Sequence, residues 1–386
     1  MSLKKQMPWQ KQLIHFWIPN IFQFKGGIQT YSAFLIEALQ SLHSDKKYEI
    51  FLKHDTSSST DLSFLANTKF HFAGAVPLQL RTLLFAMQII INGLYKKPDL
   101  VITTHLNFSI VSYLLKRFRG ISYWTVVHGV EAWDIQRPNL KIALQHADRI
   151  ISVSNYTRDR LLKEQQLDPD KISLLPNTFD ADRFKIAPKP EYLLKRYGLT
   201  VNHSIILTVA RLDQDEQYKG YDQIIQALPE IRRHIPNIHY ILVGKGSDRS
   251  RITQLISQLN LQDCVTLAGF IPDSELGDHY NLCDVFAMPS KGEGFGIVYL
   301  EALACGKPTL GGNKDGAVDA LCHGELGALV DPDNVTEIAQ VLTQILQKKF
   351  PHPIMYQPEI LRQKVIEIYG FARFKQTLKE IIQTLN

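Results

Sequence analysis

The stretch DVFAMPSKGEGFGIVYLEALACGKPTLGG, residues 284–312, decides the fold of this chain. It opens with an apolar run, 285–288, of the kind that forms a buried parallel strand. A polar loop with glycines follows over 289–296, and residues 297–304 carry apolar side chains at helical spacing. Gly306 and Pro308 end that helix, and another strand begins directly after them. The stretch therefore predicts a βαβ unit of a parallel sheet.

The start of this helix has the features of an anion site. Its first N–H groups lack partners within the helix, and the positive end of the helix dipole lies there. Gly294 and Gly296 leave the backbone open to close approach by a phosphate. Glu293 precedes the helix, and Glu301 leans back toward its N-terminus. Carboxylates beside a phosphate need hydroxyl donors, which points to a nucleotide sugar; taken alone, the two glutamates fit a solvated helix start equally well.

The same stretch resembles the retaining glycosyltransferases of family four, whose fold is called GT-B. The resemblance rests on two glutamates separated by seven residues in EGFGIVYLE (293–301), followed by EALACGKP (301–308). It implies an α/β protein of two Rossmann-like domains facing each other across a cleft, with a C-terminal helix that crosses back to the N-terminal domain. We expect Glu293 to hold the sugar hydroxyls and Glu301 the ribose hydroxyls. The donor would also meet the helix start, at Gly294, Phe295, Gly296, Ile297 and Val298.

Length and composition limit the possible architecture of the chain. The chain has 386 residues, too many for one compact core, so two domains are expected. Its composition is that of an ordinary soluble globular protein, and no long uncharged apolar stretch predicts a transmembrane helix. The first residues have no sustained apolar core or cleavage site, which argues against secretion. Four cysteines lie in the second half without CxxC spacing, as reduced thiols of a cytoplasmic protein would.

Charge is unevenly divided along the chain. Residues 1–185 hold 23 Lys/Arg against 15 Asp/Glu, whereas residues 186–386 hold 20 against 23. This imbalance indicates that the first half meets something anionic. No nucleic-acid-binding signature accompanies it, so no nucleic acid partner is expected. A membrane surface or a lipid diphosphate fits better, which predicts a cytoplasmic protein held peripherally at the inner face of the membrane.

The chain order suggests four parts. Residues 1–185 form an acceptor-side domain, and 186–200, with their prolines and lysines, form a linker. Residues 201–370 form the nucleotide-sugar-binding domain. Residues 371–386 form a C-terminal helix that packs back on the first domain, as the resemblance implies.

Two features of the first half bear on ligands and partners. A strand over 13–17 leads through Gly26 and Gly27 into a helix over 28–42, and ligands bind at that edge of parallel sheets. The pair is a second anion-site candidate, although plain turn chemistry fits a double glycine better. Residues 78–95 form a helix that is apolar nearly all round. We expect it to be buried in the helix layer, with an in-plane position at a membrane surface as the alternative.

The strand over 123–127 ends at His128, followed by Gly129. A lone histidine at a strand end is usually structural. The dipeptide nevertheless stands where the family has its cleft histidine, so His128 is a candidate site residue, with Glu131 and Trp133 in the same loop. The segments 22–27, 57–60 and 130–137 are the expected acceptor loops, and they carry no readable code for the acceptor.

Arg211 closely follows the strand over 205–209, and Lys219 precedes the next helix. A guanidinium forks onto phosphate oxygens and an ammonium acts as a point charge, so this pair suits a diphosphate. Alone it fits a solvated loop, whereas the family pattern Arg-Leu … Lys-Gly assigns it the leaving-group phosphates. Because these cations supply the positive charge, we predict no catalytic metal and no cofactor. The Asp-x-Asp triplet at 213–215 recurs elsewhere in the chain, so its spacing carries no metal prediction.

The remaining donor contacts are expected beside the sheet of the second domain. The GKG turn ending at Gly246 is another loop between a strand and a helix. Phe270 and Ile271 follow the next strand, beside the position where relatives hold a base.

Together these residues predict a metal-independent retaining hexosyltransferase. Its donor would be a nucleotide sugar, with UDP-glucose or another UDP-hexose as the first expectation, and its acceptor a saccharide or lipid-linked saccharide. Arg211 and Lys219 would stabilise charge on the departing diphosphate. Same-face attack fits better than a covalent intermediate on Glu293, and His128 would position a substrate. A nucleotide-sugar epimerase of the same architecture and a non-catalytic nucleotide-sugar-binding protein are the alternatives.

Overall fold

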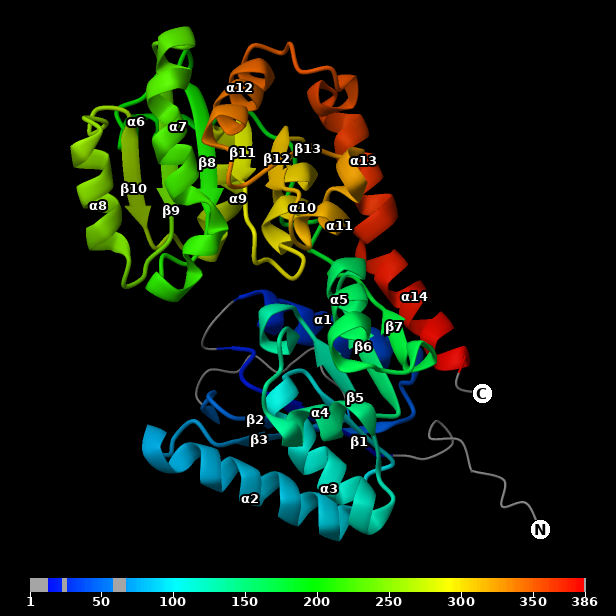
Figure 1. The fold of residues 1–386 in the computed structure, drawn as a ribbon. Coiled ribbons are helices and arrows are strands. Elements are labelled where there is room, and N and C mark those ends of the chain that lie inside the picture. Colours follow the sequence, from blue (N-terminus) through cyan, green and yellow to red (C-terminus); the bar gives the residue numbers. More distant parts are fainter. Residues whose placement is uncertain (1–12, 23–25, 58–66, 385–386) are drawn as a thin grey trace. The chain divides into compact units, whose positions relative to one another are not determined.

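The computed structural model describes residues 13–22, 26–57 and 67–384 (Figure 1). The chain divides into two compact units. Unit 1 comprises Met1–Thr178 with Phe371–Asn386, and unit 2 comprises Phe179–Gly370. Each unit has its own parallel sheet with helices packed on it, so the expected α/β class with two Rossmann-like domains is confirmed.

Unit 1 is built on a seven-stranded parallel sheet of order β3-β2-β1-β4-β5-β6-β7. The order reverses between β1 and β4, which are neighbours although β2 and β3 come between them in sequence. Such a switch point opens a crevice at the carboxyl ends of the strands. The strands are β1 Leu13–Ile18, β2 Lys47–Leu52, β3 Thr68–Phe72, β4 Leu100–Thr103, β5 Ser122–Val127, β6 Arg149–Ser152 and β7 Ile172–Leu174.

Helices cover both faces of this sheet. One face packs under α2, α3, α4 and α5, whose core side chains include Phe85, Leu115, Leu144 and Leu161. The other face carries α1 with α14, where Tyr31 meets Phe374 edge-on. The helices are α1 Gly27–Leu42, α2 Leu78–Lys96, α3 Ser109–Arg119, α4 Pro138–Gln145, α5 Asn155–Gln165 and α14 Phe371–Gln383, with short turns η3 Leu106–Phe108, η4 Val130–Ala132 and η5 Pro169–Lys171.

Unit 2 repeats the design with a six-stranded parallel sheet of order β10-β9-β8-β11-β12-β13. Its switch point lies between β8 and β11. The strands are β8 Ser204–Val209, β9 Ile238–Val243, β10 Val265–Gly269, β11 Val285–Met288, β12 Thr309–Gly312 and β13 Ala328–Val330. The helices are α6 Glu191–Arg196, α7 Tyr221–His234, α8 Arg249–Gln258, α9 Asp273–Leu282, α10 Ile297–Ala304, α11 Ala317–Ala320, α12 Val335–Leu346 and α13 Pro358–Tyr369, with turns η6 Gln214–Lys219, η7 Cys322–Gly324 and η8 Pro353–Tyr356.

The boundaries of the units differ from the expected ones. The chain divides after Thr178, seven residues before the expected end of the first domain at 185. Residues 186–200 are not a separate linker: they lie within unit 2, where α6 buries Leu193 and Leu194. The sequence does not indicate that this segment packs on unit 2, because prolines and lysines surround the short apolar run that is buried there.

The predicted burial of the helix over 78–95 is wrong for one of its faces. Only Phe85, Ile89 and Gly93 of α2 are fully buried, whereas large apolar side chains on its other side are exposed. By length and composition, α2 is also the one helix among the described residues that is apolar enough to cross a membrane, which the sequence analysis did not expect. A helix that is apolar all round does not reveal from sequence which side the core takes.

Candidate functional site

The loop between β11 and α10 is held rigidly at the carboxyl edge of the unit 2 sheet. Buried Asp315 accepts hydrogen bonds from the Ser290 hydroxyl and the Glu293 backbone N–H, both at 2.7 Å. Burial raises the pKa of this carboxyl to about 6. Gly312 and Gly316 pack so closely on the loop that a Cβ on either would collide with the carbonyl oxygen of Ser290 or Gly294. The position of Glu293 is thus fixed by its backbone.

Four charged side chains meet at this loop. Lys219 forms an ion pair with Glu293, and its ammonium lies 3.5 Å from the second carboxylate, Glu216. Glu216 also pairs with Arg211, whose Nη2 lies 2.5 Å from Oε1. Burial alone would lower the pKa of Lys219, but the carboxylates of Glu293 and Glu216 raise it above its ordinary value. The cluster therefore holds two cations beside the start of α10, each already balanced by a carboxylate.

The loop that carries Lys219 is fitted against the β11–α10 loop. Gly220 adopts φ +81°, and a Cβ there would collide with the carbonyl oxygen of Pro289. The backbone N–H of Lys291 donates to the Tyr218 carbonyl at 2.9 Å. The Tyr218 ring lies beneath the Lys219 ammonium, 5.2 Å from the ring centroid. Glycine is required after Lys219, because no side chain fits where the two loops touch.

Glu301 lies deeper than the other carboxylates. It is 8% exposed and accepts a hydrogen bond at 2.7 Å from the hydroxyl of Tyr280, which is fully buried. Burial raises the pKa of Glu301 to about 7, although the Tyr280 hydrogen bond opposes this shift. The buried carboxyl group of Glu301 is therefore stabilised either by binding a proton or by accepting a hydrogen bond from a hydroxyl group.

The start of α10 offers backbone rather than side chains. Gly296 adopts φ +87° as the N-cap residue, and no side chain caps the helix. Phe295 is buried, with its ring packed edge-on against Tyr369 at 5.4 Å, so only its backbone faces a ligand. Gly294 is buried as well, whereas Ile297 and Val298 are half-buried. These residues stay predicted donor contacts, through N–H groups in the first turn.

The residues predicted beside the base lie at the neighbouring strand ends. Gly246 follows β9 and packs on the Leu212 carbonyl so closely that a Cβ would collide with it. Phe270 follows β10 and is 68% exposed, with the Lys245 ammonium 5.1 Å from its ring centroid. Ile271 is buried. A large aromatic ring left in solvent beside a cation offers a stacking surface to a flat ligand group.

In unit 1, His128 follows β5 and is tightly packed. Its Nε2 lies 3.1 Å from the Thr104 carbonyl oxygen, and its ring meets Tyr31 edge-on at 5.2 Å. Its backbone N–H donates to Glu131 at 2.5 Å. Burial lowers the pKa of His128 to about 3, so the imidazole is neutral at physiological pH. A neutral ring whose Nε2–H points at a carbonyl suits a positioning role better than that of a principal base.

The double glycine of unit 1 shows less specialised geometry. Gly26 has extended backbone angles at the N-cap of α1, and a Cβ on Gly27 would meet nothing within 4 Å. Neither observation requires glycine, so their role as an anion site stays a prediction. Residues 23–25 and 58–60 of the expected acceptor loops lie outside the described residues. In the third loop, the Trp133 ring stacks on the guanidinium of Arg160 at 4.6 Å.

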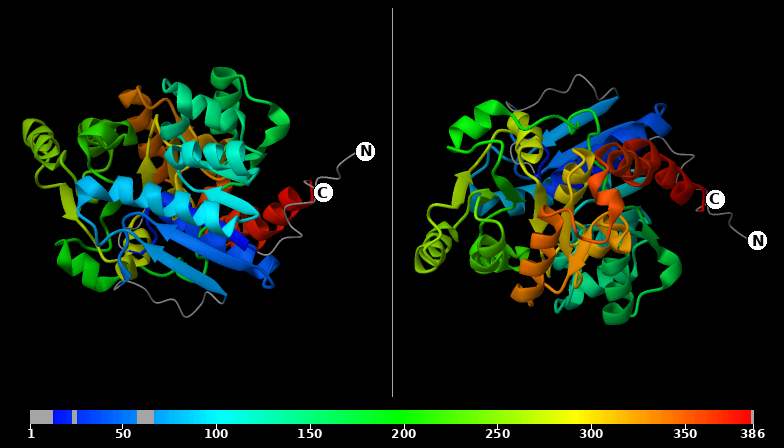
Figure 2. Two further views of the ribbon diagram at one scale, coloured as in Figure 1. Left: turned by 90° about the horizontal axis from the view of Figure 1, so that it is seen from below. Right: turned by 90° about the horizontal axis from the view of Figure 1, so that it is seen from above.

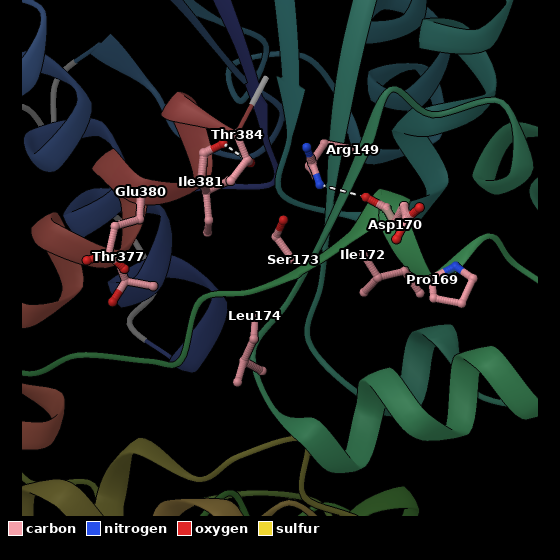
Figure 3. Close-up of a pocket in the computed structure, with 10 residues that line it drawn as sticks. All are labelled: Arg149, Pro169, Asp170, Ile172, Ser173, Leu174, Thr377, Glu380, Ile381 and Thr384. Atoms are coloured by element: carbon pink, nitrogen blue, oxygen red, sulfur yellow. Dashed lines mark hydrogen bonds between the residues drawn. The ribbon is translucent and has the colours of Figure 1, made fainter. Parts of the chain in front are cut away.

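A pocket of about 530 Å³ lies elsewhere in unit 1, between β7 and α14 (Figure 3). Arg149 and Ser173 point toward it from the sheet side, and Thr377 and Glu380 from the helix. The Arg149 guanidinium donates to the Asp170 carbonyl at 2.8 Å, which ties it to the scaffold. None of the predicted site residues lines this pocket.

Sequence analysis missed three residues that shape the candidate site: Glu216, Asp315 and Tyr280. Glu216 lies between Arg211 and Lys219 in the sequence. A carboxylate between two cations could have been predicted to form ion pairs with them. Asp315 and Tyr280 act from other loops and helices, and nothing local in the sequence indicates which glutamate or backbone N–H they reach.

Family models cover most of the chain. Residues 25–183 match the model described as Glycosyltransferase Family 4, and residues 193–365 match that of Glycosyl transferases group 1. The chain belongs to family four of the glycosyltransferases, with the GT-B fold. This confirms the family resemblance carried by residues 293–308.

Individual relatives agree on family and fold. The chain is 35% identical over 234 residues to the GDP-mannose-dependent alpha-(1-6)-phosphatidylinositol monomannoside mannosyltransferase of Mycolicibacterium smegmatis, a match that covers 57% of this chain and 59% of that protein. The D-inositol 3-phosphate glycosyltransferase of Kineococcus radiotolerans is 29% identical over 48% of this chain and 44% of its own length. The structure of HepE from Anabaena in complex with UDP matches with a TM-score of 0.78 at 19% identity, covering 97% of this chain and 100% of that one.

Proposed function

We propose that this protein is a retaining glycosyltransferase that moves a hexose from a nucleotide sugar to a saccharide or lipid-linked acceptor without a metal ion. The observation that carries the proposal is the charged cluster at the start of α10. Lys219 contacts Glu293, which lies just before the uncapped start of α10, and Arg211 is linked to Lys219 through Glu216, all within unit 2. Such groups suit a diphosphate whose charge grows as the anomeric C–O bond breaks.

The carboxylates of the cluster define how the donor would enter. In the structure Glu216 and Glu293 neutralise Arg211 and Lys219. An arriving diphosphate would take over these cations, which frees the Glu293 carboxylate to accept hydroxyl hydrogens from the sugar. Glu301, whose Oε2 is bound by Tyr280, would accept from the ribose through its remaining lone pairs.

Retention follows, in this proposal, from attack on the same face of the sugar that the diphosphate leaves. The departing phosphate oxygen takes the acceptor's proton, so no separate base is needed. Lys219 and Arg211 hold that oxygen in place, and the neutral His128 orients a substrate. A covalent route through Glu293 is less suited, because its carboxylate, once the diphosphate has taken over Lys219, accepts hydrogen bonds from the sugar hydroxyls.

Two nucleotide sugars are candidates for the donor. Sequence analysis favours UDP-glucose or another UDP-hexose. The names of the Mycolicibacterium relative and its homologues, at 34–35% identity, favour GDP-mannose as the second candidate. The exposed Phe270 ring would stack on either base. On the acceptor side, the basic first half favours a lipid-linked saccharide at an anionic membrane surface, reached from the cytoplasm.

Calorimetric titration with UDP, GDP, UDP-glucose and GDP-mannose, first without metal and then with Mg²⁺, tests the proposal. We expect micromolar binding of UDP and UDP-glucose without metal. A preference for GDP would keep the fold and the mechanism but change the donor. Binding that requires Mg²⁺ would refute metal independence. Turnover of donor without any acceptor, with interconversion of sugars, would indicate an epimerase, and binding without turnover on any acceptor a non-catalytic binding protein.

A further inference from the structure

The helix α2 has two apolar faces, and only one of them is covered. Phe85, Ile89 and Gly93 face the core of unit 1. The opposite side carries large apolar residues at spacings of three and four, which form one stripe along the helix. This outer face of α2 consists of Leu80, Leu83, Leu84, Met87, Ile91 and Tyr95, which are between 36% and 85% exposed.

An exposed stripe of this size calls for a partner. Single apolar side chains on a protein surface are normal, but this contiguous row runs from Leu80 to Tyr95, about 23 Å along the helix. Figure 1 and the left view of Figure 2 show α2 as the outermost helix of unit 1, with α3 beside it. The C-terminal part of α3 adds Leu114 and Phe118, which are 42% and 74% exposed.

The charges around the outer face have one sign. Neither α2 nor α3 contains an aspartate or a glutamate. Basic residues gather where the helices end: Lys97 directly after α2, and Arg117 and Arg119 in the last turn of α3, all of them exposed. The apolar stripe is therefore bordered by positive charge, which complements an anionic surface.

The structure assigns the outer face of α2, together with the exposed end of α3, as a docking surface for an anionic lipid bilayer. In this arrangement α2 lies in the plane of the headgroups with its outer face toward the acyl chains. Tyr95 and Phe118 would sit at the boundary between headgroups and hydrocarbon, where aromatic rings are favoured. The inference rests on the proposed function in one respect, since it gives the surface by which the enzyme would reach a lipid-linked acceptor.

Insertion of α2 across the bilayer does not fit the contacts. Its length and composition would allow a crossing. However, its inner face is part of the unit 1 core, and removing it would expose Phe85 and Ile89. The Arg81 guanidinium also donates to the Gly74 and Val76 carbonyls, at 2.7 and 3.0 Å, and so ties the first turns to the domain.

A second copy of the chain is a poorer occupant. A symmetric dimer through the outer face would pair two surfaces whose helices α2 and α3 carry no acidic residue, so the basic residues Lys97, Arg117 and Arg119 of one copy would meet no carboxylate on these helices of the other. Such an interface lacks charge complementarity. An anionic bilayer is complementary to both features, because its acyl chains contact the apolar stripe and its headgroups contact the basic residues.

Vesicle cosedimentation tests the assignment, with vesicles of phosphatidylcholine alone and of phosphatidylcholine mixed with phosphatidylglycerol. Neither donor nor acceptor is added, so a failure to dock is distinct from a failure to transfer sugar. We expect the full chain to bind the anionic vesicles more tightly than the neutral ones, and less tightly at high salt. The triple variant L83Q/M87Q/I91Q should lose at least about tenfold in vesicle affinity, because three inserted side chains become polar.

A matched control is available in unit 2, where V201Q/I360Q/I368Q replaces three equally exposed apolar residues. This control should bind vesicles like the unaltered chain, and all three proteins should bind nucleotide alike. R117A/R119A should reduce binding to anionic vesicles only. Equal vesicle binding by both triple variants, or no binding by the unaltered chain, would overturn the assignment. So would a dimer in analytical ultracentrifugation that L83Q/M87Q/I91Q dissociates.

Discussion

Lys219 shows how a single residue can be both largely buried and charged. Its ammonium is largely shielded from water, yet it contacts the Glu293 carboxylate and lies 3.5 Å from that of Glu216. A buried cation is tolerated when it is paired, and removing one partner leaves an uncompensated charge. In the proposed function, a diphosphate would bind both cations of the cluster by displacing their counter-ions.

Replacing Glu293 with glutamine tests the division of roles in this cluster. Glu293→Gln keeps the shape but removes the negative charge and replaces one acceptor oxygen with an NH2 donor. We expect the turnover number for sugar transfer to fall at least about a hundredfold, as for other groups that act mainly in the transition state. UDP affinity should be spared or increased, because Lys219 loses a competing anion.

Arg211→Ala is the companion variant, and it should lower both turnover and UDP affinity. Steady-state kinetics and calorimetry on the same preparations separate the two effects. An equal loss of turnover and UDP affinity in Glu293→Gln would contradict the assigned roles.

Glu301 predicts a measurable pH dependence of stability. Burial raises its pKa from 4.5 to about 7, so between these values the folded chain holds a proton that the unfolded chain releases. The sign follows from proton linkage: the contribution of Glu301 is fully present below about pH 4.5 and is lost as the pH rises to 7. Its size is about 3 kcal/mol, from the equivalence of pKa shifts and free energy.

Glu301→Gln should therefore reduce the loss of stability between pH 4.5 and 7, as measured by urea unfolding across this range. The exposed Glu359→Gln in α13 should leave the profile unchanged. If Glu301→Gln and the unaltered chain show the same slope, Glu301 is not a buried carboxyl of raised pKa.

At the level of elements, the candidate site depends on contacts in which only glycine fits. Gly312, at the end of β12, packs on the Ser290 carbonyl, and a Cβ there would collide with it. Gly312→Ala should cost about 1–3 kcal/mol of stability, the usual penalty of overpacking. It should also weaken UDP binding, because the loop that carries Glu293 must shift.

Gly27→Ala in α1 is the control for stability, since its added methyl group meets nothing within 4 Å and alanine favours helices. Thermal unfolding of both variants gives the comparison, and UDP titration of Gly312→Ala against the unaltered chain measures the effect on binding. Unchanged stability in Gly312→Ala would mean that the loop is not fixed as described.

The sequence predicts the bounds of a helix or strand well where its ends are marked by local residue patterns. The strand over 285–288 and the helix over 297–304 match β11 and α10 residue for residue, because an apolar run, glycines and a proline mark both ends. The burial of α2 could not be predicted, since the choice of inner face depends on the sheet beneath it. The roles of Asp315 and Tyr280 depend on contacts between distant segments, which no local pattern encodes.

At the scale of the whole molecule, the chain returns to its first unit at the end. The last helix, α14, belongs with unit 1, where Phe374, Leu378 and Ile382 are buried against the rest of that unit. Unit 1 is thus discontinuous in sequence, whereas unit 2 is one segment. The stability of the N-terminal residues should then depend on the C-terminal ones, which are more than 300 positions away.

Leu378→Ala puts this dependence to the test. Removing a fully buried leucine side chain should destabilise unit 1 by about 2–5 kcal/mol, through lost burial and the cavity that remains. Hydrogen exchange followed by mass spectrometry should show faster exchange in α1, which packs on α14, and unchanged exchange in β8 and β11 of unit 2. Lys379→Ala, at the exposed neighbouring position, should change neither pattern. Faster exchange spread evenly over both units would show that they unfold as one cooperative body, and nucleotide binding would then depend on the last helix as well.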